Sequence, residues 1–157
     1  MGLKVGIANQ VHPFASPILR HYNMKQLEND LFRARIYKND ARLYVEWLRS
    51  VSPEEFREGV EQLVKLMLEE EIELWIVDSS RLHGITLSDQ HWILHHILPL
   101  LQNAKLRKLA RVSSGDIFQY MSFEEMTEKV LRKYEMNVEV AQFTSLAMAE
   151  AWISIKD

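Results

Sequence analysis

Cysteine is absent from the 157-residue sequence. Disulfide bonds, thiolate catalysis and zinc sites built on cysteine are therefore excluded. Long apolar runs are also absent, and none approaches the roughly 20 residues that a membrane-spanning helix needs. Because the N-terminus lacks the charged-then-apolar order of a signal peptide, the sequence predicts a cytoplasmic protein without a membrane span.

Positive charge is not in excess either. The chain has 19 Lys and Arg residues against 22 Asp and Glu residues, a formal net charge of −3. Binding to a phosphate backbone needs clustered Lys and Arg, and here the basic residues are scattered, so nucleic acid is not expected as a partner. The remaining composition, 47% hydrophobic and 26% charged, is typical of a globular protein of one-domain length.

Residues 1–29 differ from the rest of the chain. They contain two of the five glycines and two of the four prolines, which favour irregular structure. Residues 4–7 fit a short strand, and Ile18, Leu19, Tyr22 and Leu27 fit one face of a short helix. We therefore predict an N-terminal extension at 1–29 and a single domain at 30–157.

Two stretches alternate apolar and polar side chains, which is the period of a half-buried strand. Their apolar positions are Phe32, Ala34 and Ile36 in the first and Leu43, Val45 and Trp47 in the second. Between them, Asn39 and Asp40 tolerate the left-handed backbone of a tight turn. The sequence predicts an antiparallel hairpin.

A helix and a buried strand follow this hairpin. Ser52 can cap the helix, Pro53 suits its first position, and Glu55 can complete a capping box. The apolar face is formed by Phe56, Val60, Leu63 and Met67. Residues 72–77 then form a nearly continuous apolar run, which is typical of a central strand buried on both faces.

The second half of the chain repeats this alternation. A mostly apolar helix is expected at about 89–102, capped by Thr86 or Ser88 and kinked rather than ended by Pro99, because Leu100 and Leu101 continue its apolar face. Residues 109–112 predict a strand, 122–131 a helix, 138–143 a final strand and 146–153 a last helix. Alternating strands and helices indicate an α/β fold with a mixed, mostly parallel sheet of about five strands and covering helices.

This order of elements resembles stand-alone bacterial STAS (SpoIIAA-like) domains over roughly residues 31–155. The stretches that carry the resemblance are Leu43-Tyr44-Val45-Glu46-Trp47, Ser52-Pro53-Glu54-Glu55-Phe56-Arg57-Glu58-Gly59, Trp75-Ile76-Val77-Asp78, Trp92 with Pro99, Leu109-Ala110-Arg111-Val112, and Phe143-Thr144-Ser145-Leu146 with Trp152-Ile153. The resemblance implies a cytosolic regulatory or binding module. In the best understood members, a partner kinase phosphorylates a serine after the third strand, and this switches protein binding.

The first candidate site is the loop that begins at the place of that phosphorylated serine. Its members are Asp78, Ser79, Ser80, Arg81 and His83. A phosphate there would add about −1.5 to −2 charges beside a helix N-terminus. The regulatory members place a glycine directly after the serines, however, whereas Arg81-Leu82-His83-Gly84 intervene here. The alternative is that the serines only satisfy backbone groups of a turn.

The second candidate site is the loop after the next strand, formed by Ser113, Ser114, Gly115 and Asp116. We expect the loop to extend to residue 121. Ligands of open α/β sheets bind beyond the carboxyl ends of parallel strands, so the two loops would face one crevice if their strands are neighbours. Hydroxyl groups, a cation and backbone N–H groups could then hold an anion or an acidic side chain. The alternative is two ordinary solvated turns.

Catalytic and metal-binding patterns are weak. His91 and His95 share a helix face, and His83 or Asp89 could add a ligand, but two ligands are fewer than a zinc site requires. A Ser–His–Asp set drawn from Ser79, His83 and Asp78 has nothing in the sequence to position it. We therefore expect no metal, no cofactor and no enzyme activity.

The leading functional hypothesis is a regulatory or protein-interaction module with an unknown protein partner, which would include partner switching. The alternative is a carrier that binds a small apolar or anionic ligand against the kinked second helix. Four tryptophans and the apolar second helix leave more hydrophobic surface than a small domain readily hides. This predicts a homodimer, the commonest closed assembly.

Overall fold

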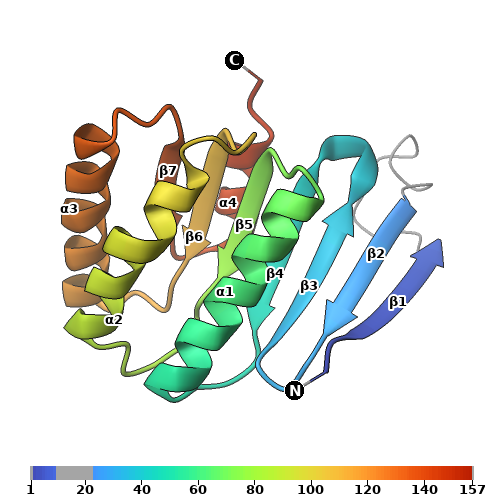
Figure 1. Cartoon of the computed structure of the whole chain (residues 1–157), viewed down its shortest axis with the longest axis horizontal. Helices are drawn as coiled ribbons and strands as arrows, with labels where there is room; N and C mark the ends of the chain where they lie inside the picture. Colours follow the sequence, from blue (N-terminus) through green and yellow to red (C-terminus); the bar gives the residue numbers. More distant parts are fainter. Residues whose placement is uncertain (1, 10–22, 157) are drawn as a thin grey trace.

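The computed structural model describes the backbone of residues 2–9 and 23–156 and, apart from positions 7–9 and 117–120, their side chains. One sheet runs through the molecule in the order β1-β2-β3-β4-β5-β6-β7 (Figure 1). The strands are β1 Lys4–Asn9, β2 Asn23–Glu28, β3 Phe32–Tyr37, β4 Arg42–Trp47, β5 Leu74–Asp78, β6 Lys108–Val112 and β7 Glu139–Phe143. The α-helices are α1 Pro53–Glu69, α2 Leu87–Trp92, α3 Ile117–Lys133 and α4 Leu146–Ile153.

The sheet has an antiparallel half and a parallel half. Strands β1 to β4 pair antiparallel, and β4 to β7 pair parallel. From β4 to β7, each strand lies beside the previous one and always on the same side of it. Right-handed crossovers therefore place the connecting helices on one face of the sheet. Figure 1 shows α1, α2 and α3 on that face and α4 on the other.

Two apolar cores follow from this layering. The larger lies between the sheet and α1, α2 and α3, and contains the buried side chains of Phe32, Val45, Trp47 and Leu63. The smaller lies beneath α4, where Ile76, Ala110, Val112, Ala149 and Ile153 pack together. The nearly continuous apolar run of β5 is explained by this arrangement, because Trp75 belongs to the larger core and Ile76 to the smaller one.

The α/β class and the mixed sheet are as predicted, but over residues 2–9 and 23–156 the sheet has seven strands and not about five. The two additional strands come from residues 1–29. Met24 and Leu27 of β2 are both buried, and their spacing of three is also a helical spacing, so the segment shows no strand period. The predicted strand at 4–7 is present as β1, whereas most of the short helix expected around 18–27 lies outside the described residues and Leu27 belongs to β2.

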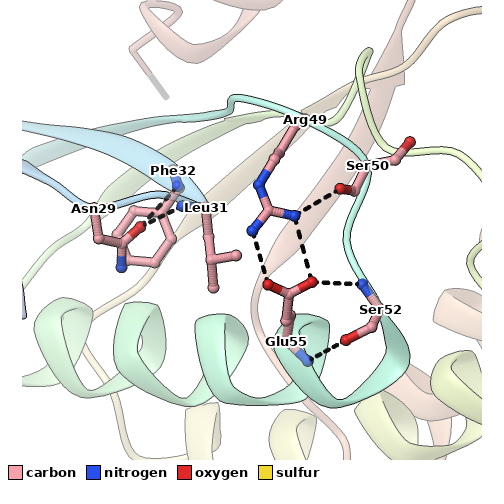
Figure 2. A network of polar contacts seen from close by, with 7 residues as sticks. All are labelled: Asn29, Leu31, Phe32, Arg49, Ser50, Ser52 and Glu55. Carbon is pink, nitrogen blue, oxygen red and sulfur yellow. Dashed lines mark hydrogen bonds and ion pairs between the residues drawn. The ribbon is translucent and has the colours of Figure 1, made fainter. Parts of the chain in front are cut away.

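The predicted domain boundary at residue 29/30 lies in the turn between two paired strands. The Asn29 Oδ1 atom accepts hydrogen bonds from the backbone N–H groups of Leu31 at 2.8 Å and Phe32 at 2.9 Å (Figure 2). This turn places β2 beside β3 over five residue pairs. Part of the predicted extension therefore shares the sheet of the domain.

The predicted hairpin is present as β3 and β4, with a change in its turn. Residues Lys38–Asp40 form a short 3₁₀ helix, and the left-handed residue is Ala41, with φ of 49°. The sequence predicts that conformation for Asn39 and Asp40 instead. The 3₁₀ helix moves the reversal one residue further along the chain.

The start of α1 has the predicted capping box. The backbone N–H of Glu55 donates to Ser52 Oγ at 3.1 Å, and the Ser52 N–H donates to Glu55 Oε1 at 2.9 Å. Arg49 also donates to both Glu55 oxygens (Figure 2). The hydrogen bonds from Arg49, followed by the one from the Ser52 N–H, lower the pKa of Glu55 to about 2.

The second helix differs from the continuous kinked α-helix that was predicted. After α2, the chain forms a π-helical turn at Ile93–Ile97 and a 3₁₀ helix at Leu98–Leu101. The segment therefore stays helical past Pro99, but its winding changes. Pro99 lacks a backbone N–H and its ring crowds the preceding turn, and the wider π turn lies directly before it.

The third helix begins at Ile117, five residues earlier than the predicted start at residue 122. The predicted loop at 113–121 is accordingly shorter and ends at Asp116, a residue type favoured directly before a helix. Within the described part of the chain, no helix is long and apolar enough to cross a membrane.

Candidate ligand cavity

A cavity of about 150 Å³ lies inside the larger core, between the parallel half of the sheet and the three helices on its face. Its wall is almost entirely apolar. The residues that form it are Trp47, Phe56, Val60, Leu63, Val64, Trp75, Val77, Ser79, Leu82, Ile85, Gln90, Ile93, Leu94, Ile97, Leu98, Leu101, Leu109, Arg111, Phe123, Met126, Thr127 and Val140.

The floor of the cavity is set by strand alternation. Successive side chains of a strand point to opposite faces, so Trp75 and Val77 of β5 point to the same face as Leu109 and Arg111 of β6. The pairing register places Val77 beside Arg111 and Leu109 beside Val140. The floor is therefore a flat patch built from three neighbouring parallel strands.

The roof is formed by α2 and the irregular turns that follow it. Leu94 and Ile97 from the π turn, with Leu98 and Leu101 from the 3₁₀ helix, line the cavity. The change in helical winding alters the angles at which these side chains leave the backbone. A regular α-helix would present them at a constant 3.6-residue period, so the π turn determines which of them reach the cavity.

An ion pair between the partly exposed Arg57 and the buried Asp89 ties the roof to α1. Asp89 is 2% exposed, and its Oδ1 accepts a hydrogen bond from Arg57 Nε at 3.2 Å. Its other oxygen accepts from the Thr86 hydroxyl at 2.8 Å and completes the N-terminal cap of α2. Arg57 also lies over the Trp92 ring at 5.5 Å. These contacts fix the distance between α2 and α1 on one face of the sheet.

A few polar groups interrupt the apolar wall. Ser79 and Thr127 are buried, and Arg111 is partly buried at the carboxyl end of β6. Trp75 Nε1 and Gln90 Oε1 are buried and have no hydrogen-bond partner among the described residues. A buried polar atom without a partner is costly.

The first predicted loop lies beside this cavity, but only one of its five predicted side chains lines it. Ser79 is 7% exposed and lines the cavity. Ser80 instead donates its hydroxyl and its backbone N–H to Asp78 Oδ1. Arg81 pairs with Glu46 at 3.4 Å, and the exposed His83 donates its backbone N–H to Ser50 Oγ. These contacts are those of a structured turn.

The second predicted loop begins next to the first. The N–H of Ser79 donates to the Val112 carbonyl at 2.8 Å, and the N–H of Ser113 donates to the Phe143 carbonyl at 2.9 Å. Ser113 is buried, and its hydroxyl has no partner among the described residues. Gly115 has φ of 89°, a backbone conformation that favours glycine, whereas Ser114 and Asp116 are exposed.

The two loops thus share one end of the sheet, as expected for neighbouring parallel strands. Of the nine predicted site residues, all within the described part of the chain, only Ser79 lines the cavity. The prediction that the loop residues bind a ligand or a partner stays a prediction.

Sequence reasoning missed Arg111 and Gln90. The sequence predicts a short strand around Arg111, and alternation with Leu109 places both side chains on the inner face. A charged residue at an inward position is the signal that could have identified it. The sequence does not identify Gln90 in this way. It lies near the start of a helix that is predicted to be apolar on most sides, so the pattern does not show that its side chain faces inward.

The histidines of the second helix lie on its outer surface. His91 and His95 are exposed, and their ring centroids are 5.9 Å apart. Within residues 2–9 and 23–156, no three His, Asp or Glu side chains gather closely enough to hold a metal ion.

Comparison with known proteins gives a similarity in structure and none in sequence. No family model matches the sequence, and no curated protein matches it. Among solved structures, the chain is similar to an uncharacterised protein of the DUF3478 family from Shewanella loihica PV-4, described as having a SpoIIAA-like fold. The sequence identity is 15% and the TM-score 0.47, and the similarity covers 97% of this chain and 94% of that one. The fold name is the one that the sequence resemblance predicted.

Proposed function

We propose that the protein binds a small, mainly apolar molecule in the cavity between α1, α2, α3 and the parallel strands. It would act as a binding or carrier protein and not as an enzyme. The observation that carries the proposal is the apolar cavity of about 150 Å³. A cavity of that size with an apolar lining can stay dry and accept a molecule the size of benzene.

The apolar surface of the wall supports this proposal. The wall is almost entirely apolar, and apolar surface removed from water contributes about 25 cal/mol per Å². A bound apolar molecule would cover part of that wall. The π turn in the roof adds support, because π-helical turns occur frequently at functional sites.

The partner-switching hypothesis has less support from the geometry. A kinase needs access to its serine, and Ser79 is 7% exposed. The hydroxyl of Ser80 is held by Asp78. Ser79 is therefore buried, and Ser80 is held in the turn that follows β5. This favours the alternative in which the serines only stabilise the turn.

Thermal unfolding in the presence of toluene tests the proposal. A ligand at 100 times its dissociation constant stabilises the native state by about 2.7 kcal/mol, which raises Tm by roughly 5–11 °C for a chain of this length. Two of the four tryptophans, Trp47 and Trp75, line the cavity, so their fluorescence should change in the same titration.

Two variants of the helical roof localise the effect. Leu94→Ala removes a side chain that lines the cavity, and the enlarged space should accept naphthalene. Leu100→Ala is the matched control, because Leu100 is 53% exposed on the same segment and should leave toluene binding unchanged. The proposal is wrong if toluene at its solubility limit shifts neither Tm nor fluorescence, or if the Leu100 variant alone abolishes the effect.

A further inference from the structure

We propose that Arg111 makes the cavity selective for small carboxylic acids, with the apolar body of the ligand inside the cavity and its carboxylate on the guanidinium group. This inference rests on the proposed function, since it names the class of molecule that the cavity takes. It adds a residue with a defined role to a cavity that is otherwise apolar.

The position of Arg111 is the first argument. It lies on the inner face of β6, where its register neighbours are Val77 on β5 and Gln142 on β7. The next inward residue of the same strand is Leu109, which also lines the cavity. A cation therefore stands at the carboxyl end of an apolar floor, where ligands of open α/β sheets bind.

The contacts of Arg111 hold the side chain in place without neutralising it. Its Nη1 donates to Gln142 Oε1 at 2.7 Å, and its guanidinium lies 4.7 Å from the centroid of the Phe123 ring. The amide is neutral and the ring contact is a cation–π interaction. Within the described part of the chain, no carboxylate lies within ion-pair distance of Arg111. Its Nε and Nη2 atoms donate no hydrogen bond there.

The electrostatics of this arrangement favour an anion. Burial disfavours the charged form of a basic group, and it lowers the pKa of Arg111 from its ordinary value. An arginine nevertheless remains protonated in proteins, so the positive charge persists in a partly desolvated place. Charges in such places are normally paired, and a bound anion would supply the missing partner.

A carboxylate fits this partner better than other anions. One guanidinium carries one positive charge, which a single carboxylate balances. The free Nε and Nη2 edge offers two parallel donors, the geometry that pairs with both oxygens of a carboxylate. The volume of about 150 Å³ leaves room for a body of one aromatic ring or a short chain.

Phenylacetate and 2-phenylethanol provide a matched test, because they share a ring and a two-carbon arm and differ in the acid group. Both are titrated into the full-length protein and followed by calorimetry. Charge-assisted hydrogen bonds predict that phenylacetate binds about tenfold to a hundredfold more tightly. In Arg111→Met this preference should disappear while 2-phenylethanol binds as before.

Two further measurements keep the test independent of how well that variant folds. Arg35→Met is the matched control, because Arg35 lies on the opposite sheet face beside Gln26, and it should leave the preference unchanged. In the unaltered protein, the ¹⁵N-detected Nε–H resonance of Arg111 should shift with phenylacetate and stay in place with 2-phenylethanol.

The possible results separate this inference from the proposed function. Equal affinity for both compounds, or an Arg111 resonance unmoved by bound phenylacetate, overturns the inference and leaves the apolar binding cavity standing. Loss of the preference in Arg35→Met overturns it as well. Failure of phenylacetate, 2-phenylethanol and toluene to bind overturns both proposals.

Discussion

Adding one methylene to the cavity wall should stabilise the protein. Val77 and Val45 pair on neighbouring strands and point to the same face. Val45 is 0% exposed, whereas Val77 borders the cavity and remains partly exposed. The substitution Val77→Ile keeps the β-branched side chain that suits a strand, and it directs one additional carbon into empty space.

The expected gain follows from burial of that carbon. A buried methylene contributes about 0.8 kcal/mol, and a chain of this length gains about 2–4 °C in Tm per kcal/mol. The Tm of the ligand-free protein should therefore rise by about 2–3 °C in differential scanning calorimetry. The same substitution should weaken toluene binding, because it removes part of the space that the ligand occupies.

The matched control is Val112→Ile on the opposite sheet face. Val112 is 3% exposed and packs in the smaller core beneath α4. An additional carbon there meets filled space, and overpacking of this kind typically costs about 1–3 kcal/mol. An equal fall in Tm for Val77→Ile and Val112→Ile would show that the two positions are packed equally well and that Val77 does not border empty space.

Three other predictions concern the packing of α1, its capping box and the assembly state. Gly59→Ala should lower the free energy of unfolding by about 1–3 kcal/mol in a urea titration, because the new Cβ would lie 2.6 Å from the Trp47 ring. This cost exceeds the gain from the better helix propensity of alanine. Glu58→Ala is the control and should stay within about 0.5 kcal/mol of the parent. The folded protein lowers the pKa of Glu55 from 4.5 to about 2, so the stabilisation by its carboxylate is present above pH 4.5 and lost as the pH falls towards 2. Glu55→Gln should make the free energy of unfolding less dependent on pH in this range. An unchanged dependence would show that Glu55 does not have the lowered pKa. Sedimentation velocity should detect the predicted homodimer, and a single 18.5 kDa species at high concentration would remove that prediction.

Short sequence patterns predicted those parts of the fold that are determined by residues close together in the chain. The capping box at Ser52 and Glu55 and the apolar run of β5 each follow from side chains close in sequence, and both are present. The local pattern also predicted a strand at residues 4–7, which is present as β1. It did not predict β2. The pairing of β2 with β1 and β3 is not visible within the segment itself, and the burial of Met24 and Leu27 on opposite faces removes the alternation that marks a strand.

The site was less predictable than the fold, for a physical reason. Loop chemistry identified Ser79, because hydroxyl groups after a buried strand are visible in the sequence. A cavity forms where side chains from different elements do not fill the space between them. Here it depends on the π turn before Pro99 and on the distance between α1 and α2, which the Arg57–Asp89 pair fixes. Neither can be predicted from the spacing of apolar residues. The inward direction of Arg111 was available from strand alternation.

Nuclear Overhauser effects between toluene and the methyl groups of the protein would locate the bound ligand. With leucine and valine methyls labelled, we expect contacts from the ring protons to Leu94, Leu109 and Val140, which come from the roof and two strands of the floor. Contacts restricted to exposed side chains such as Leu100, or no contacts at a toluene concentration that saturates the thermal shift, would rule out binding in the cavity.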